Sequence, residues 1–172
     1  MRTIIKNKKG DMPSLIIVLV VIIFVMAVFS LIFSNVFKSI LDELEGSGEF
    51  PAASVTTMNF VEDKTIPFLD YAIFFTFIAI IIGLIISSIY IDTHPALAVV
   101  FIIMTVVAIL LAGLFANILT EVGETSELAT TYNSFVYTKL LITHFPLMVF
   151  VVALIVGIVL YGKSRGGGYA GI

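Results

Sequence analysis

The chain has 172 residues, of which 60% are hydrophobic and only 12% charged, and its formal net charge is −3. A soluble domain carries roughly 25% charged residues, so there are too few polar side chains to cover a water-facing surface, which excludes a soluble protein. The negative net charge offers no basic footprint for nucleic acid. The absence of cysteine excludes disulfides, thiolate metal sites and cysteine nucleophiles.

Four apolar stretches are long enough to cross a bilayer, whose hydrocarbon core needs about 20 helical residues. They cover residues 14–37, 68–91, 95–119 and 140–161. Strands of a membrane barrel would be about ten residues long with alternating polarity, a pattern these runs lack. The sequence therefore predicts an all-α integral membrane protein. We expect one four-helix transmembrane domain over residues 1–172, with a flexible, glycine-rich tail at 162–172.

The distribution of basic residues predicts the orientation of the spans. Lysine and arginine gather near the two ends of the chain, at Arg2, Lys6, Lys8, Lys9, Lys163 and Arg165. The loops at 38–66 and 120–139 are acidic instead. Only residues 92–94 separate the second and third spans, so these spans must form an antiparallel hairpin. We therefore expect both termini inside and both acidic loops outside.

The first acidic loop begins with a helical pattern. Residues 36–44 place apolar side chains on one side and acids on another, which continues the first helix. Gly46-Ser47-Gly48 then ends the helix, and Phe50-Pro51 begins what we expect to be an irregular return to the membrane.

The other acidic loop also resumes a helical pattern. Thr125 or Ser126 is expected to cap an amphipathic helix that lies along the outer membrane surface.

Two prolines lie near the starts of predicted spans. Pro67 falls at a first turn, where its missing N–H costs nothing. Pro146 follows a helical pattern already under way, which predicts a kink or a break before the last span.

Small residues mark where membrane helices approach closely. They recur at helical spacing in the second, third and fourth spans, at Gly83, Ser87, Ala108, Ala112, Ala153 and Gly157. These stripes predict a compact bundle or a homo-oligomer.

One set of polar residues lies at similar depth near the outer boundary, one residue from each span. The set is Asn35, Asp70, Asn117 and His144. Asp70 and His144 are candidates for a titratable pair near neutral pH; the alternative is that each residue caps its own helix or reaches interfacial water. No spacing typical of a catalytic, cofactor or metal site occurs, and His94 and His144 are expected on opposite membrane faces. The sequence therefore predicts no enzyme, no cofactor and no metal.

Two resemblances are visible. The run Lys8-Lys9-Gly10-Asp11 followed by an apolar stretch resembles the class III signal of archaeal prepilins, over roughly the first 37 residues. The overall layout, with a short hairpin at 91–95 and two acidic outer loops, resembles small four-helix membrane proteins of membrane-containing tailless viruses and related archaeal or bacterial elements. This second resemblance implies a virion membrane component.

Three functions remain open. The first is a non-catalytic structural or scaffolding protein that links the lipid bilayer to a protein layer such as a viral capsid. The second is a holin-like pore former, because holins are short and helical and often end in basic residues. The third is an accessory subunit of a larger membrane complex. Membrane-embedded carboxylates typical of proton-coupled transporters are missing from the middle of every span.

Overall fold

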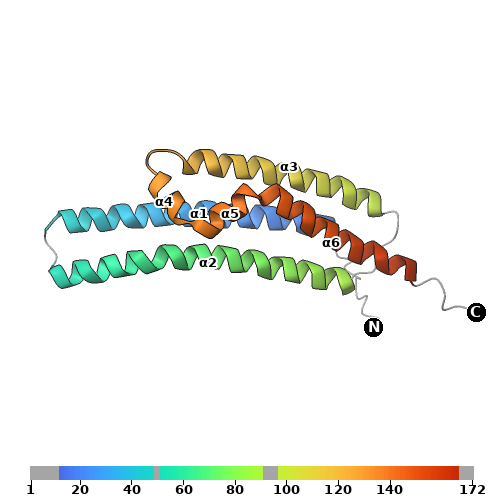
Figure 1. Ribbon diagram of the computed structural model, residues 1–172, viewed down its shortest axis with the longest axis horizontal. Coiled ribbons are helices and arrows are strands. Elements are labelled where there is room, and N and C mark those ends of the chain that lie inside the picture. Colours follow the sequence, from blue (N-terminus) through green and yellow to red (C-terminus); the bar gives the residue numbers. More distant parts are fainter. Residues whose placement is uncertain (1–11, 49–50, 91–96, 167–172) are drawn as a thin grey trace, which may run out of the picture.

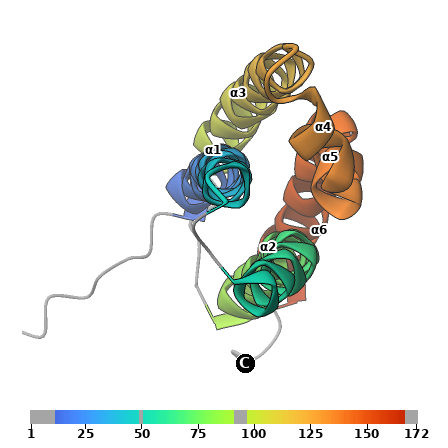
Figure 2. The same ribbon diagram turned by 90° about the vertical axis from the view of Figure 1, so that its left-hand side faces the viewer.

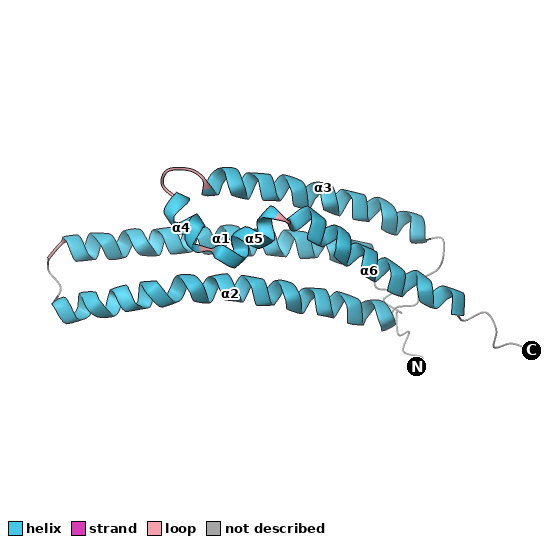
Figure 3. Ribbon diagram, in the orientation of Figure 1, coloured by secondary structure: helices cyan, strands magenta, loops and turns pink. Residues whose placement is uncertain are grey.

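The structure is a computed structural model that describes residues 12–48, 51–90 and 97–166. Within these residues the chain forms helices joined by short turns, with no strand (Figure 3). The all-α prediction is therefore confirmed. The link at 91–96, the basic segment at 1–11 and the end at 167–172 lie outside the described residues, so the predicted 92–94 hairpin turn and much of the predicted tail do too.

Four helices are long and apolar enough to cross a membrane, which fits a multi-pass membrane protein. They are α1 (Met12–Gly46), α2 (Ala52–Tyr90), α3 (Leu97–Gly123) and α6 (Phe145–Gly166). Two short helices, α4 (Ala129–Ser134) and α5 (Val136–Thr143), connect α3 to α6. Each predicted span overlaps one long helix, although α6 starts later than residue 140 because α5 occupies the first residues of that stretch.

The long helices alternate in direction, so α1 begins and α6 ends at the same end of the molecule (Figure 1). Seen end-on, α1 lies beside α2 and α3, and α6 closes the bundle by contacting the same two helices (Figure 2). The helices α4 and α5 continue the line of α6 toward the far end of α3 (Figure 1). Together, α4, α5 and α6 thus occupy the position that one straight helix would otherwise fill.

The bundle core is almost entirely apolar. Its larger cluster joins α1 residues such as Leu19 and Val20 to Ala108 and Ala112 of α3 and to the α6 face around Val149. A smaller cluster nearer the end of α3 joins α1 to α3, α4 and α5 through Ala27, Leu31, Leu119, Tyr132 and Ile142. Close packing of these buried side chains fixes the relative positions of the helices.

The small residues predicted to mediate helix packing differ in how deeply they are buried. Ala108, Ala112 and Ala153 are fully buried inside the bundle. The position of Gly157 lies under the ring of Phe101, whose Cε1 would be 3.1 Å from a Cβ added there. Gly83 instead lies on an exposed face of α2 with nothing within 4 Å of such a Cβ, and Ser87 is half-buried.

The first acidic loop is mostly helix: Phe50 lies outside the described residues and Pro51 is not helical, but the chain after them is helix from Ala52 and not the expected irregular return. The turn occurs where Gly46-Ser47-Gly48 predicted it, with Gly48 in the left-handed region at φ 67°. Pro51 precedes α2, and the helix then runs without interruption through Pro67. A proline inside a helix removes one backbone hydrogen bond and crowds the carbonyl four residues before it, yet α2 stays continuous from Ala52 to Tyr90.

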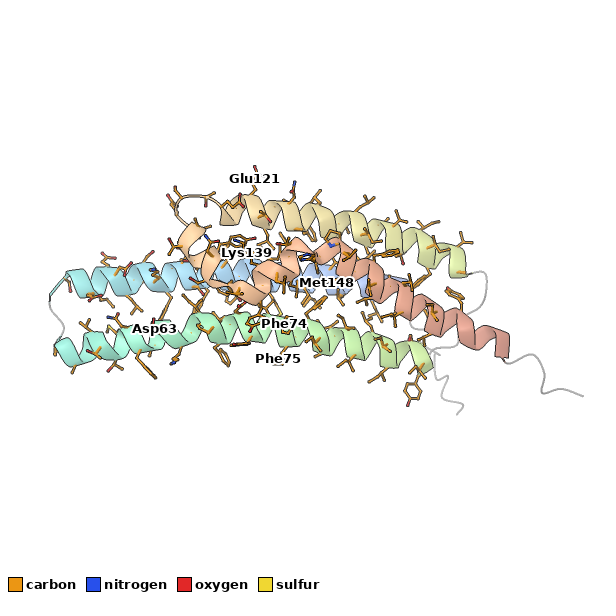
Figure 4. The ribbon with its side chains drawn as sticks, viewed as in Figure 1. Asp63, Phe74, Phe75, Glu121, Lys139 and Met148 are labelled. Carbon is orange, nitrogen blue, oxygen red and sulfur yellow. The ribbon has the colours of Figure 1, made fainter. Side chains whose placement is uncertain are left out.

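The end of α1 and the start of α2, residues 37–46 and 52–64, therefore form a pair of antiparallel helices that we call the projecting hairpin. It extends well beyond the end of α3 and beyond α4 (Figure 1). Figure 4 places Asp63 on the projecting part of α2 and Glu121 near the end of α3.

The segment between α3 and α6 folds into the bundle, so its predicted position along the membrane surface is wrong. Tyr132 of α4 and Phe135 are both almost fully buried against the other helices. The residue that caps α4 is Leu128, and neither Thr125 nor Ser126 takes that position. The predicted break near Pro146 is confirmed, because α5 ends at Thr143 and α6 begins at Phe145. Since α6 continues to Gly166, helix covers the first residues of the predicted tail.

Candidate functional site

The most unusual polar group is the carboxylate of Asp70, which is 3% exposed and lies just inside the predicted second span. Its Oδ2 accepts a hydrogen bond from the backbone N–H of Tyr137 at 2.9 Å, and its Oδ1 accepts one from the N–H of Thr138 at 2.6 Å. Both donors belong to the first turn of α5. Asp70 of α2 therefore caps the N-terminus of a different helix.

This arrangement follows from the break between α4 and α5. Phe135 has non-helical dihedrals, φ −86° and ψ 76°, and its side chain makes no capping hydrogen bond. The first N–H groups of any helix have no partner within it, and a buried donor left unpaired costs free energy. A carboxylate satisfies two of these donors and also stabilises the positive end of the helix dipole. Asp70 thus allows a helix to begin inside the bundle.

Aromatic rings surround this cap. The ring centroid of Tyr137 lies 5.0 Å from that of Tyr71 and 5.5 Å from that of Phe74. In Figure 4, Phe74 lies on the side of α2 that faces α5, whereas Phe75 lies on the outer side. The hydroxyl of Thr138 is buried and has no hydrogen-bond partner among the described residues. Asp70 itself is only 3% exposed, although the side chains of Tyr71 and Tyr137 are 45% and 37% exposed.

The structure gives the four predicted outer polar residues different partners. Asn35 of α1 accepts a hydrogen bond from Thr131 of α4, with 3.4 Å between Oδ1 and Oγ1. His144 is exposed, and its Nδ1 lies 3.1 Å from the carbonyl oxygen of Leu140. Asn117 is exposed on α3. The groups bonded to Asp70 are backbone amides rather than His144, so Asn35 and Asp70 each hold the α4–α5 segment to a different long helix.

The Asp70 carboxylate joins α2 to the start of α5. Both oxygens of Asp70 already accept hydrogen bonds from the backbone. Among the residues that the structure describes, no three His, Asp or Glu side chains come together in a way that could hold a metal ion. The sequence identified Asp70 as a polar residue at span depth. It did not identify the partners, because main-chain amides become available only where the helix breaks.

A second candidate site is a groove of about 530 Å³ within the projecting hairpin. Its lining residues come from the facing sides of α1 and α2 and are Phe37, Leu41, Ala53, Ser54, Thr57, Met58 and Val61. Leu41 is 7% exposed and forms the floor, whereas Val61 is 43% exposed at the rim. The groove is therefore apolar inside, and it lies outside the predicted spans for nearly all of its length.

Two further grooves lie between long helices within the predicted spans. One, of about 510 Å³, runs between α3 and α6, and the other, of about 420 Å³, runs between α1 and α3. Their walls are almost wholly apolar, as expected of helix surfaces in contact with hydrocarbon. They offer no convergent polar groups for a specific ligand.

Comparison of the chain with protein-family models, with curated proteins and with solved structures gives no match. The functional argument therefore depends on the geometry described above.

Proposed function

We propose that this chain is a non-catalytic structural membrane protein that presents the projecting hairpin to a protein layer beside the bilayer, such as the capsid of a membrane-containing virus. The observation that carries the proposal is the length of the hairpin. At 39 residues, α2 is about twice as long as the roughly 20 residues needed to cross the hydrocarbon core. The bundle anchors the chain, and the excess length carries side chains away from the membrane.

The composition of the bundle supports an anchor rather than a pore. The core clusters contain apolar side chains drawn from every long helix. The buried hydroxyl of Ser88 donates to the carbonyl oxygen of Ile85 in its own helix, at 2.6 Å. A water-filled pore needs polar groups that face a shared lumen, and the Ser88 hydroxyl bonds its own helix instead. A holin-like pore former is the alternative that the experiments below must exclude.

The proposed orientation places the projecting hairpin outside and both chain ends inside, as the basic terminal segments indicate. Since the chain lacks cysteine, the single changes Glu45→Cys and Ser164→Cys provide clean reporters. A membrane-impermeant maleimide added to intact cells is expected to label position 45 and to spare position 164. After the cells are permeabilised, both positions should react. Labelling of position 164 alone in intact cells would reverse the orientation.

The scaffold function predicts contacts that depend on position along α2. A photoreactive phenylalanine analogue at Phe60, 63% exposed on the hairpin, should crosslink to a water-soluble layer protein in the native membrane. The matched control is Phe75, also 63% exposed but within the predicted span, which should crosslink chiefly to lipid. Gel analysis with mass spectrometry measures the adducts.

Two results would contradict the scaffold function. No protein adduct from position 60 would remove the proposed contact, and adducts from position 75 to a membrane-embedded protein would indicate an accessory subunit instead. Purified chain in liposomes must also retain a trapped dye. Release of the dye would favour the pore former.

A further inference from the structure

We infer that the groove of the projecting hairpin is a docking site for a basic amphipathic helix of a partner protein. This inference rests on the proposed function and names the chemistry of the partner. The groove residues follow helical spacing on both sides, with Phe37 and Leu41 one turn apart on α1 and Thr57 and Val61 one turn apart on α2. A helix whose apolar stripe has the same spacing fits between them as the third member of a bundle.

The projecting hairpin is incompletely packed as it stands. Leu41 is the one fully buried apolar residue among its described side chains, and neither core cluster reaches it. Ile40, Phe60 and Val61 remain 51%, 63% and 43% exposed. Most of the stability of a helix in a protein comes from packing of its apolar face. Two helices that meet through so few buried side chains gain that packing when a third helix covers the groove.

The charge around the groove selects the partner. Asp42 follows the groove residue Leu41, and Glu45 lies one turn beyond Leu41 on the same helix, so the acidic rim of the groove lies on α1. Residues 38–66 contain six acidic residues and only two lysines. One of the two, Lys64, lies over the ring of Phe60, with Nζ 5.7 Å from its centroid. Complementary charges favour a partner with lysine or arginine beside its apolar stripe.

Charge also argues against a second copy of this chain as the occupant. Two projecting hairpins that met at their grooves would bring two acidic surfaces together, and like charges across an interface oppose association. A lipid chain would cover the apolar lining but would leave the acidic rim without a partner. A basic amphipathic helix satisfies both the lining and the rim.

The test uses the full chain in nanodiscs of zwitterionic lipid and a fluorescent synthetic helix of leucine and lysine, about five turns long. Its leucines follow helical spacing. A scrambled peptide and a leucine–glutamate peptide serve as probe controls, and empty nanodiscs report direct binding to lipid. Fluorescence anisotropy should show binding of the leucine–lysine helix above the empty nanodiscs. The two control peptides should bind at least about tenfold more weakly.

Two variants of exposed positions test the site. Val61→Lys places a charge in the lining, and the pair Asp42→Lys with Glu45→Lys reverses the rim. Each is expected to weaken binding about tenfold or more. The matched control, Glu121→Lys with Glu124→Lys, makes the same change in charge near the end of α3, away from the groove. It should change the affinity by less than about twofold.

Equal weakening by the rim pair and by the control pair would show attraction to overall charge and would overturn the inference. So would binding no stronger than to empty nanodiscs, a lipid that co-purifies with the chain and is lost on Val61→Lys, or self-association that Val61→Lys abolishes. If the Phe60 adduct forms in native membranes but is unchanged in the Asp42→Lys with Glu45→Lys chain, the scaffold function stands and the docking site fails. If no Phe60 adduct forms at all, the scaffold function itself fails.

Discussion

Replacement of Asp70 by alanine is expected to destabilise the bundle by about 2–5 kcal/mol, because the N–H groups of Tyr137 and Thr138 would remain buried without an acceptor. Asp70→Asn keeps one acceptor oxygen and the side-chain shape, so it should cost roughly half as much. Thermal unfolding of the purified chain in detergent measures both. Hydrogen exchange should also show that the amides of Tyr137 and Thr138 lose protection before those of α3 do.

The matched control is Asp63→Ala, in the same helix but exposed. It should change the free energy of unfolding by no more than about 0.5 kcal/mol. Burial of a carboxylate is itself costly, so the sign of the Asp70 effect depends on the two hydrogen bonds. Equal stability of the Asp70→Ala and Asp63→Ala chains would mean that α5 does not need the Asp70 cap.

The Asp70 cap also shows which features of the fold the sequence predicts and which it does not. Long apolar runs predict the spans because the bilayer requires them, whatever the neighbouring helices do. Pro146 predicts the break before α6 because it removes a donor at a fixed place. Phe135 has no such local signal, since its non-helical dihedrals depend on how α4 and α5 pack. The partners of Asp70 follow from that break and were therefore not predicted.

The α2 half of the projecting hairpin was missed for a related reason, whereas the predicted continuation of the first helix over residues 36–44 is confirmed. Residues 52–66 are more polar than a span and are followed by Pro67, a pattern that predicts a loop. The helix forms because Pro51 precedes its first turn and because Leu41 of α1 lies opposite Thr57 and Met58 across the groove. Asn117 is exposed on α3, because the neighbouring helices decide which residues of a uniformly apolar helix face inward.

Substitution of Gly123 by alanine is expected to destabilise the bundle, at the end where α3 meets α4, by about 1–3 kcal/mol through overpacking. A Cβ at this position would lie 2.5, 2.6 and 2.9 Å from Cγ, Cδ2 and Cδ1 of the Tyr132 ring. The ring cannot move aside easily, because Tyr132 is 3% exposed and packs with Leu119 and Ile142. The backbone dihedrals of Gly123 are open to alanine, since φ is not positive there, so the effect is purely one of contact.

Thermal unfolding of Gly123→Ala beside Gly83→Ala measures this effect. Gly83 lies within α2 with nothing within 4 Å of an added Cβ, so alanine there should be neutral or should stabilise the helix by up to about 1 kcal/mol. A second change that removes the ring, Tyr132→Ala, should make Gly123→Ala nearly harmless, so that the double variant is less destabilised than the sum of the single ones. Strict additivity would mean that the two residues do not touch, and that α4 is held to α3 by contacts other than this one.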